Sequence, residues 1–589
     1  MIYLKRLFIL AVAIPCLIQS CQLIEPTDEN QNTFSRIYSD PDYAEGMLMN
    51  AYIALPTNDI SFNDVATDDA VSNISNNNYR RAAIGEWSSK YNPFDMWYTS
   101  NRIILYLNYF IDNVVDSVEW KWTNKDLSAL YQKRLLGESY GLRALFQYYL
   151  LETVGGYSAG NELLGIPIYE KPFGIKDNEF KKPRATFKES VEHIYADIDK
   201  ALQYLTMDKY QNITDPSQLP PGYEDVKSIA NYNDVFGNRF NQRINGQFIK
   251  ALKSRVALLA ASPAFSDGDQ QLWERAAEYA ADVIDAAGGV GSMDPNGHRY
   301  YLGTYVDKLS VVKGNDQQEM ILRRPISASN SLEVNNFPPS LFGNGSVNPS
   351  QNLVDAFPMA NGYPINHAES GYDPLDPYKN RDPRLSLYIV YNKSKMSNKL
   401  IVTAQGGKID AKDSTSTSTR TGYYLRKFIR EDVNANPAQR NSKNHYQVHF
   451  RFTELFLIYA EAANEAWGPD GTGKKTFSAR DVIAAIRKRG GIKQPDLYLA
   501  SITNKEEMRN LIRNERRLEL CFEGFRFWDL RRWKLNLTES VRGVNIDFEG
   551  NYHYVDVEER NFNNNYMHYG PLPDFEIIKF DQLIQNKGW

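Results

Sequence analysis

The stretch RFTELFLIYAEAANEAW, residues 451–467, decides the fold class, because its apolar side chains recur three and four positions apart. That spacing places them on one face of an α-helix. A second periodic segment, 478–489, follows and stops at Gly490 and Gly491. Paired helices of this kind bury one face of each helix against the next, as in a tetratricopeptide-like array. The sequence therefore predicts a mostly α protein built on a helical-repeat scaffold.

The same periodicity continues outward from this pair over most of the chain. It runs through 103–115, 127–150, 191–205, 248–259, 273–284, 482–486 and 508–522. Thr186 with Glu189, and Thr503 with Glu506, have the spacing of capping boxes at helix starts. We expect a single domain over 33–589. Its helix pairs should lie around 100–150, 186–286 and 451–524, with loop-rich insertions around 60–98 and 290–450.

Composition narrows the function classes. The chain has 589 residues, with 67 Lys plus Arg against 72 Asp plus Glu. The net charge of -5 gives no indication of a basic surface, so we expect no nucleic-acid partner. Rings are abundant, at 38 Tyr, 28 Phe and 9 Trp, and many fall in the long segments 73–98 and 291–342. Loops longer than about 15 residues are usually functional or disordered, and this aromatic content argues against disorder.

The first residues read as an export signal. Lys5 and Arg6 precede an apolar run over 7–18, which is too short to cross a hydrocarbon core of about 30 Å as a helix. The run ends in Ile-Gln-Ser-Cys at 18–21, which resembles a bacterial lipobox. We expect a lipoprotein signal peptide over 1–20, lipid on Cys21 and a polar tether over 21–32, with a plain secretory peptide as the alternative.

Several short motifs suggest enzyme chemistry, but their contexts argue against it. Residues 156–160 fit G-x-S-x-G, yet a predicted helix precedes them where a nucleophile elbow needs a strand. Residues 468–474 approach a phosphate loop but also leave a helix. His445 and His449 lack the Glu of a zinc-protease motif, so we expect no metal and no cofactor. Cys521 sits mid-helix between apolar residues and reads as a buried thiol.

A set of long motifs in one order resembles the SusD/RagB family of outer-membrane nutrient-uptake lipoproteins. The motifs are NERRLELCFEGFRFWDLRRW at 514–533, PSQNLVDAFPMANG at 349–362, NRDPRL at 380–385, GYYLRKF at 422–428, 451–465 and QNKGW at 585–589. The N-terminal half agrees through the lipobox, 97–108 and 251–265. The resemblance implies a tetratricopeptide-like scaffold with a loop-built carbohydrate face, associated with a TonB-dependent SusC-like barrel.

The motif at 514–533 should hold the fold rather than bind ligand. Its acidic and basic residues alternate at spacings that permit ion pairs, and arginine makes planar two-point contacts with carboxylates. Alternating charge usually marks a solvated or paired face. The clearest family motif is therefore a poor candidate for the glycan site.

Sugar binding needs aromatic platforms for the apolar C–H faces and polar side chains for the hydroxyl rim. Both loop segments supply these groups. We predict glycan contacts from Asp69, Asn77, Tyr79, Arg81, Trp87 and Tyr91 in the first segment, and from Tyr300, Tyr305 and Phe337 in the second. For each ring the competing interpretation is that it packs as a loop anchor.

The sequence and the resemblance together predict a non-catalytic, lipid-anchored glycan-binding protein at the outer membrane. It would capture oligosaccharide and deliver it to the SusC-like transporter. One alternative is an exported glycoside hydrolase, which needs only two carboxylates close in space. Another is a transporter lid or assembly subunit with little glycan affinity of its own.

Overall fold

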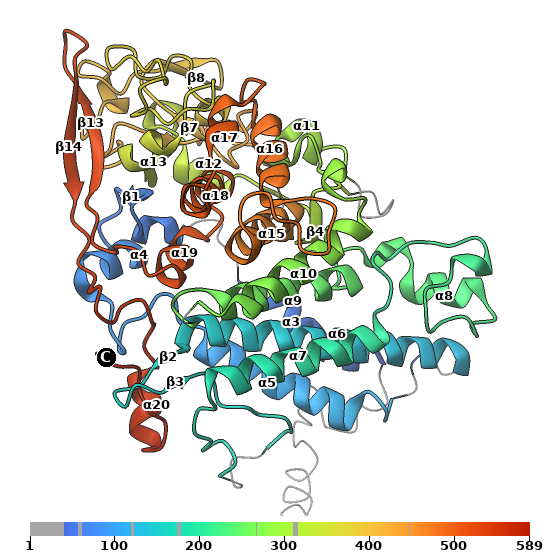
Figure 1. Ribbon diagram of the computed structural model, residues 1–589. Coiled ribbons are helices and arrows are strands. Elements are labelled where there is room, and N and C mark those ends of the chain that lie inside the picture. The colour runs from blue at the N-terminus through green and yellow to red at the C-terminus, as the bar shows by residue number, and fades with distance from the viewer. Residues whose placement is uncertain are drawn as a thin grey trace, which may run out of the picture.

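A stack of helices forms the lower part of the molecule, and loops and short strands form the upper part (Figure 1). This computed structural model describes residues 41–56, 62–118, 120, 123–173, 178–266, 268–309, 316–445 and 447–589. The predicted signal peptide, the tether and Cys21 lie outside the described residues. None of the described helices is both long enough and apolar enough to cross a bilayer.

The helices of the lower part are α3 (Pro41–Ile53), α5 (Trp97–Tyr109), α6 (Lys125–Val154), α7 (Phe187–Tyr204), α8 (Ile229–Phe236), α9 (Gly246–Ala261) and α10 (Gln270–Ala286). The stack continues above α10 into the upper part through α15 (Phe452–Trp467), α16 (Ala479–Gly490) and α18 (Lys505–Glu519). Neighbours in this stack include α5 with α6, α6 with α7, α9 with α10, and α10 with α15. The largest apolar core runs continuously through these helices. Residues 451–467 and 478–489 thus form the predicted pair α15 and α16, and the helical-repeat scaffold is confirmed.

Shorter helices punctuate the remaining chain. They are α4 (Asn78–Arg81), α11 (Gly303–Val306), α12 (Ser331–Asn336), α13 (Gln351–Ala356), α14 (Pro383–Tyr388), α17 (Leu497–Ser501), α19 (Arg526–Arg532) and α20 (Asp574–Lys579).

All strands in the described ranges pair in antiparallel twos. The pairs are β1 (Ala70–Ser72) with β6 (Val347–Pro349), β2 (Gly156–Tyr157) with β3 (Leu163–Leu164), β4 (Met320–Arg323) with β12 (Val448–Arg451), β5 (Ser327–Ser329) with β11 (Lys443–His445), β7 (Ile389–Val390) with β10 (Tyr424–Leu425), β8 (Ser394–Met396) with β9 (Lys399–Ile401), and β13 (Val541–Ile546) with β14 (Tyr552–Glu558). The last pair is the long hairpin along the left edge in Figure 1. The ladders β1–β6, β4–β12 and β5–β11 join segments that are far apart in sequence, whereas β2–β3, β8–β9 and β13–β14 are local hairpins.

Capping side chains mark the starts of α7 and α18, and one of the two predicted caps is wrong. Thr186 forms the expected capping box with Glu189 at the start of α7. At α18 the cap is Asn504, whose side chain accepts a hydrogen bond from the backbone N–H of Glu507. The predicted pairing of Thr503 with Glu506 is therefore wrong by one residue, because Asn competes well with Thr at this position.

Candidate functional site

The pairing of β1 with β6 brings the two predicted loop segments together. Ser72 lies opposite Val347, and the Asn73 backbone N–H donates to the carbonyl of Ser346. The Asn73 side chain donates to the carbonyls of Asn344, at 2.8 Å, and Ser418, at 3.3 Å. Residues near positions 73, 344 and 418 therefore form one continuous surface.

Apolar side chains stand exposed on this surface. Phe342 is 55% exposed, Ile409 44% and Ile74 39%. Ile74 follows Asn73, and the carbonyl of Ile409 accepts a hydrogen bond from the Ser418 hydroxyl. We define the loop face as Ile74, Asn76, Phe342, Asn344, Ile409 and Arg420. It combines an exposed ring with amide and guanidinium groups, which are the groups that a pyranose requires.

Backbone and ion-pair contacts hold the loop face in place. Phe342 has a left-handed backbone with φ of 65°, which is unusual for a bulky residue, and its side chain is exposed. Arg420 donates to the carboxylate of Glu558 at 2.6 Å, and Arg80 donates to the same carboxylate at 2.6 Å. Glu558 on β14 thus holds Arg420, the guanidinium group of the loop face, in place.

Four of the predicted glycan contacts are wrong, because the structure buries them. Asp69 is fully buried and pairs with Arg517 at 2.6 Å. Trp87, Tyr300 and Phe337 are 3%, 3% and 1% exposed. Side chains with so little exposed surface cannot offer a face to a sugar on the outside of the loops.

Trp87 shows why these rings are buried. Its ring centroid lies 4.7 Å from that of Trp589, 5.5 Å from that of Phe94 and 5.8 Å from those of Phe527 and Phe562. Its indole N–H donates to Asn92. Segments from three parts of the chain close around it, and the local sequence contains no sign of that packing.

The remaining predicted contacts keep some exposure, and their role in glycan binding stays a prediction. Asn77 caps α4 by accepting from the backbone N–H of Arg80. Arg81 pairs with Glu86 and lies 4.5 Å above the Tyr91 ring. The half-buried Tyr305 donates its hydroxyl to Asn296, and the half-buried Tyr79 lies beside Phe94.

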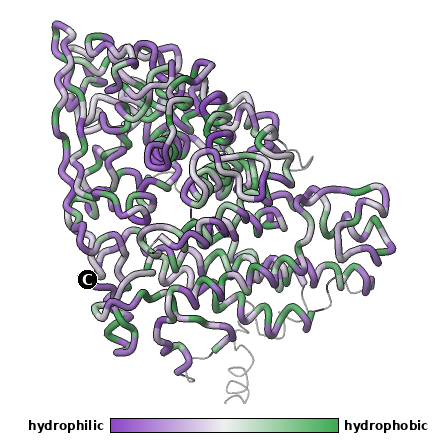
Figure 2. The backbone as a smooth tube through the Cα atoms, in the orientation of Figure 1, coloured by the Kyte–Doolittle hydropathy of each residue, from purple (hydrophilic) through white to green (hydrophobic). Residues whose placement is uncertain are grey.

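The charged motif at 514–533 holds the fold, as predicted. Arg384 is completely buried and contacts Asp382 at 2.7 Å, Glu515 at 2.9 Å and Glu519 at 3.0 Å. Figure 2 shows α18 as a strongly hydrophilic coil inside the upper part of the molecule. A further set of ion pairs extends this network, namely Arg487–Glu515, Arg489–Glu519, Arg516–Asp529, Arg532–Glu461, Arg517–Asp68 and Arg526–Asp68.

Beneath the loops lie two neighbouring cavities of about 250 and 260 Å³, which we call the central pocket. Both are lined by Gln447, Val448, His449, Glu454, Glu523 and Phe525. Tyr79 lines the first cavity and Tyr300 the second, so the structure does bring the two predicted segments to one place.

Titratable groups in the central pocket are strongly perturbed. Burial raises the pKa of Glu152 to about 7. Burial, with the nearby charges of Arg324 and Arg255, lowers the pKa of His449 to about 3. Both oxygens of Glu454 accept hydrogen bonds from Arg255, at 2.5 and 2.7 Å. A carboxylate held at both oxygens is poorly placed to act as a nucleophile or base.

The residues of the motifs that suggested enzyme chemistry make contacts that hold the fold. Ser158 is buried at the turn between β2 and β3. The ring of His445 on β11 contacts the carboxylate of Glu333 at 2.9 Å. Cys521 is buried, as predicted, and burial raises the pKa of its thiol to about 12. Its predicted mid-helix position is wrong, because α18 ends at Glu519 and Cys521 lies in the turn that follows.

Comparison with known proteins identifies the family. A model described as the SusD family matches residues 310–589, and one described as starch-binding and associating with the outer membrane matches 41–219. The chain belongs to the SusD/RagB family. A SusD-like protein of Formosa agariphila is 28% identical over 166 residues, and this match spans only 29% of that relative.

Solved structures show that the SusD fold extends along the chain. A SusD-like protein from Bacteroides fragilis NCTC 9343 has a TM-score of 0.71 at 23% identity, covering 95% of this chain and 99% of the other. A SusD-like carbohydrate-binding protein from the same strain has a TM-score of 0.69 at 20% identity, covering 93% of this chain and 100% of the other. A laminarin-binding SusD-like protein has a TM-score of 0.55 at 18% identity, covering 93% and 99%.

Proposed function

We propose that the protein is a non-catalytic glycan-binding lipoprotein of the outer membrane. It captures oligosaccharide on the loop face and passes it to a TonB-dependent SusC-like transporter. One observation carries the proposal: β1 and β6 join the two loop segments, and the Phe342 side chain is exposed two residues from the exposed Asn344, which contacts Asn73. Membership of a family with carbohydrate-binding relatives supports the ligand class.

The loop face fits a sugar chemically. The Phe342 ring can stack against the C–H face of a pyranose, and the amides of Asn76 and Asn344 can bond its hydroxyls as both donors and acceptors. Neutral glycans carry no charge and cannot form ion pairs with the protein, so an exposed ring should supply much of the affinity.

Native gels that contain glycan test this site. We expect the wild-type protein to be retarded by at least one member of a polysaccharide panel that includes laminarin, and Phe342→Ala to lose the retardation. Phe548→Ala is the matched control, because Phe548 is 78% exposed at the turn between β13 and β14, outside the loop face. Equal retardation of Phe342→Ala and wild type would place the site elsewhere. If no glycan retards the wild type, the lid or assembly role becomes the better explanation.

The non-catalytic part of the proposal has a separate test. A hydrolase would need a working carboxylate pair, yet in the central pocket Glu454 is held by Arg255, and Asp529 by Arg516 and Arg532. Incubation with the same panel should release no reducing sugar. Release that disappears in Glu152→Gln would instead identify a hydrolase.

The lipid anchor is tested at Cys21. Durable anchoring requires more than one acyl chain, which a mature bacterial lipoprotein would carry on this residue. We expect Cys21→Ala to move the protein from the membrane fraction to the soluble fraction. Cells that lack the transporter are the right background, since binding to a barrel could also retain the protein at the membrane.

A further inference from the structure

Three arginine side chains share one carboxylate at the edge of the loop face. Arg80 on α4 and Arg420 both bond the same oxygen of Glu558, Oε2, at 2.6 Å. Arg560 bonds the other oxygen, Oε1, at 2.7 Å. Figure 1 shows α4, β1 and β14 together at the left of the molecule. We call Arg80, Arg420 and Arg560 the arginine cluster.

The arginine cluster holds more positive than negative charge. Glu558 supplies one negative charge against three positive ones, and no other carboxylate among the described residues lies within 4 Å of Arg80 or Arg420. Asp68 lies near Arg560, but other arginines already pair with Asp68 at 2.7 and 2.8 Å. Although burial opposes ionisation, the guanidinium groups hold the pKa of Glu558 below its usual value. Like charges this close repel one another, so the excess is suited to an anion that arrives from outside.

Two of the three arginines can reach a ligand. Arg560 is 3% exposed, and its remaining N–H groups bond backbone carbonyls. Arg80 and Arg420 keep 17% and 21% of their side chains exposed. Within the described residues the Arg80 side chain is bonded only through Nε, so both of its Nη groups are open to solvent. Their four N–H donors form the planar fork that matches a carboxylate or a tetrahedral oxyanion.

The arginine cluster adjoins the groups that we propose to bind sugar. The Arg420 guanidinium approaches the carbonyl of Ser72, at the end of β1, to 3.4 Å. The backbone N–H of Arg80 donates to the side chain of Asn77, which follows Asn76 of the loop face. Amides that bind hydroxyls and guanidinium groups that bind anions therefore meet at one edge of the loop face.

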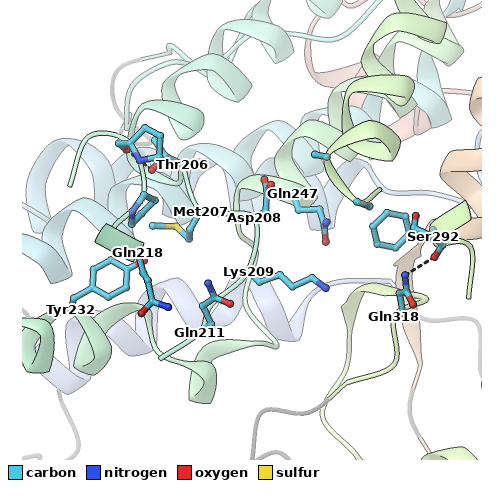
Figure 3. Close-up of a pocket in the computed structure, with 15 residues that line it drawn as sticks. Thr206, Met207, Asp208, Lys209, Gln211, Gln218, Tyr232, Gln247, Ser292 and Gln318 are labelled. Atoms are coloured by element: carbon cyan, nitrogen blue, oxygen red, sulfur yellow. Dashed lines mark hydrogen bonds between the residues drawn. The ribbon is translucent and has the colours of Figure 1, made fainter. Parts of the chain in front are cut away.

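A cavity of about 470 Å³ in the helical scaffold has no comparable excess of charge (Figure 3). There the positive charge of Lys209 is offset by the nearby carboxylate of Asp316. Figure 3 also shows the Gln318 amide bonded to the carbonyl of Ser292. Unmatched positive charge beside amides that bind hydroxyls thus distinguishes the loop face from this cavity.

We propose that the loop face is specific for an anionic glycan, one whose sugars carry a carboxylate or a sulfate ester. Arg80 and Arg420 would bind the anionic group, while Phe342 and the amides of the loop face bind the sugar itself. Arg560 is too buried to contact ligand and would hold Glu558 in place. This inference rests on the proposed glycan-binding function and names its substrate class.

Native gels with matched polysaccharides test this preference on the full-length protein. Polysaccharides of uronic acids are paired with their carboxyl-reduced forms, and sulfated polysaccharides with their desulfated forms, so the two arms distinguish carboxylate from sulfate. We expect at least one anionic member to bind about tenfold more tightly than its neutral counterpart, the effect of one hydrogen bond to a charged group. The double variant Arg80→Gln with Arg420→Gln should bind both members of that pair equally.

Arg102→Gln, an exposed position on α5, is the matched charge control and should bind like wild type. A thermal melt near that of wild type verifies the fold of the double variant. If the double variant melts early, Arg80→Gln alone leaves Glu558 with two arginines and should still lose at least half of the preference.

The inference is overturned if neutral members bind as tightly as their anionic partners, or if the folded variants keep the full preference. Retardation by neutral glycans alone would overturn it and leave the proposed glycan-binding function intact. If no glycan of either kind retards the wild type, the proposed function and this inference fail together.

Discussion

At the scale of single residues, similar aromatic side chains in one loop differ in role: some are buried in the core and others are partly exposed. Trp87 is enclosed by four rings, whereas Tyr91 lies half-exposed beneath Arg81. Truncation of a large buried ring removes its burial and leaves a cavity, at a cost of about 3–5 kcal/mol. We expect Trp87→Ala to lose this much free energy of unfolding in urea denaturation. Tyr91→Ala should lose less than about 1 kcal/mol, and an equal loss in both variants would contradict the assignment.

Glu152 makes stability depend on pH. Burial raises its pKa from 4.5 to about 7, so the folded protein holds more protons than the unfolded chain between these values. Its contribution to the free energy of unfolding is therefore largest below about pH 4.5, falls as the pH rises, and is lost above about pH 7.

Glu152→Gln isolates this effect, because glutamine can still accept the hydrogen bond from the Tyr148 hydroxyl. Urea denaturation from about pH 4 to pH 8 should show the variant gaining stability relative to wild type as the pH rises. A constant difference across this range would show that Glu152 does not titrate there. Asp64, whose pKa burial also raises to about 7, is common to both proteins and cancels in the comparison.

At the scale of elements, the start of α18 offers a sharp comparison between neighbours. Asn504 caps the helix, whereas Thr503 lies one residue outside it. Loss of a capping side chain typically costs about 1 kcal/mol. We expect Asn504→Ala to lower the free energy of unfolding by about this amount, and Thr503→Ala to change it by less than half as much. If Thr503→Ala were more destabilising than Asn504→Ala, Thr503 would be the capping residue, as the sequence pattern predicted.

The β1–β6 ladder is the element that creates the loop face. It joins residues more than two hundred positions apart, and each strand is only a few residues long. Strands this short have no measurable alternation in sequence, so neither the pairing nor the neighbours of Phe342 can be read from local pattern. Phe337 and Phe342 look alike in sequence, yet one is buried beside Val390 and Tyr424 and the other is exposed.

At the scale of the whole molecule, the buried charge network ties the C-terminal motif to the rest of the chain. Arg384→Ala would leave Asp382, Glu515 and Glu519 as buried carboxylates with one cation fewer. Breaking a buried ion pair by removing one partner typically costs about 3–5 kcal/mol. We expect Arg384→Ala to lose this much free energy of unfolding, measured by urea denaturation.

The control for this prediction is Arg542→Ala, whose side chain is 41% exposed and pairs with Asp355. An exposed pair contributes less than about 1 kcal/mol. If Arg384→Ala were no more destabilising than Arg542→Ala, the network would not hold the fold.

The sequence by itself determined the helical scaffold, the family and the structural role of the 514–533 motif. Helical periodicity, capping chemistry and alternating charge depend only on residues that are close in sequence. These residues are also close in the folded protein, so the patterns can be read without knowing the tertiary structure. Only the tertiary structure decided which rings face solvent. Trp87, Tyr300 and Phe337 became core because distant segments closed around them, and Phe342 was left exposed by the turn that leads into β6. Exposure depends on the whole surface that surrounds a side chain, and no local pattern contains that information.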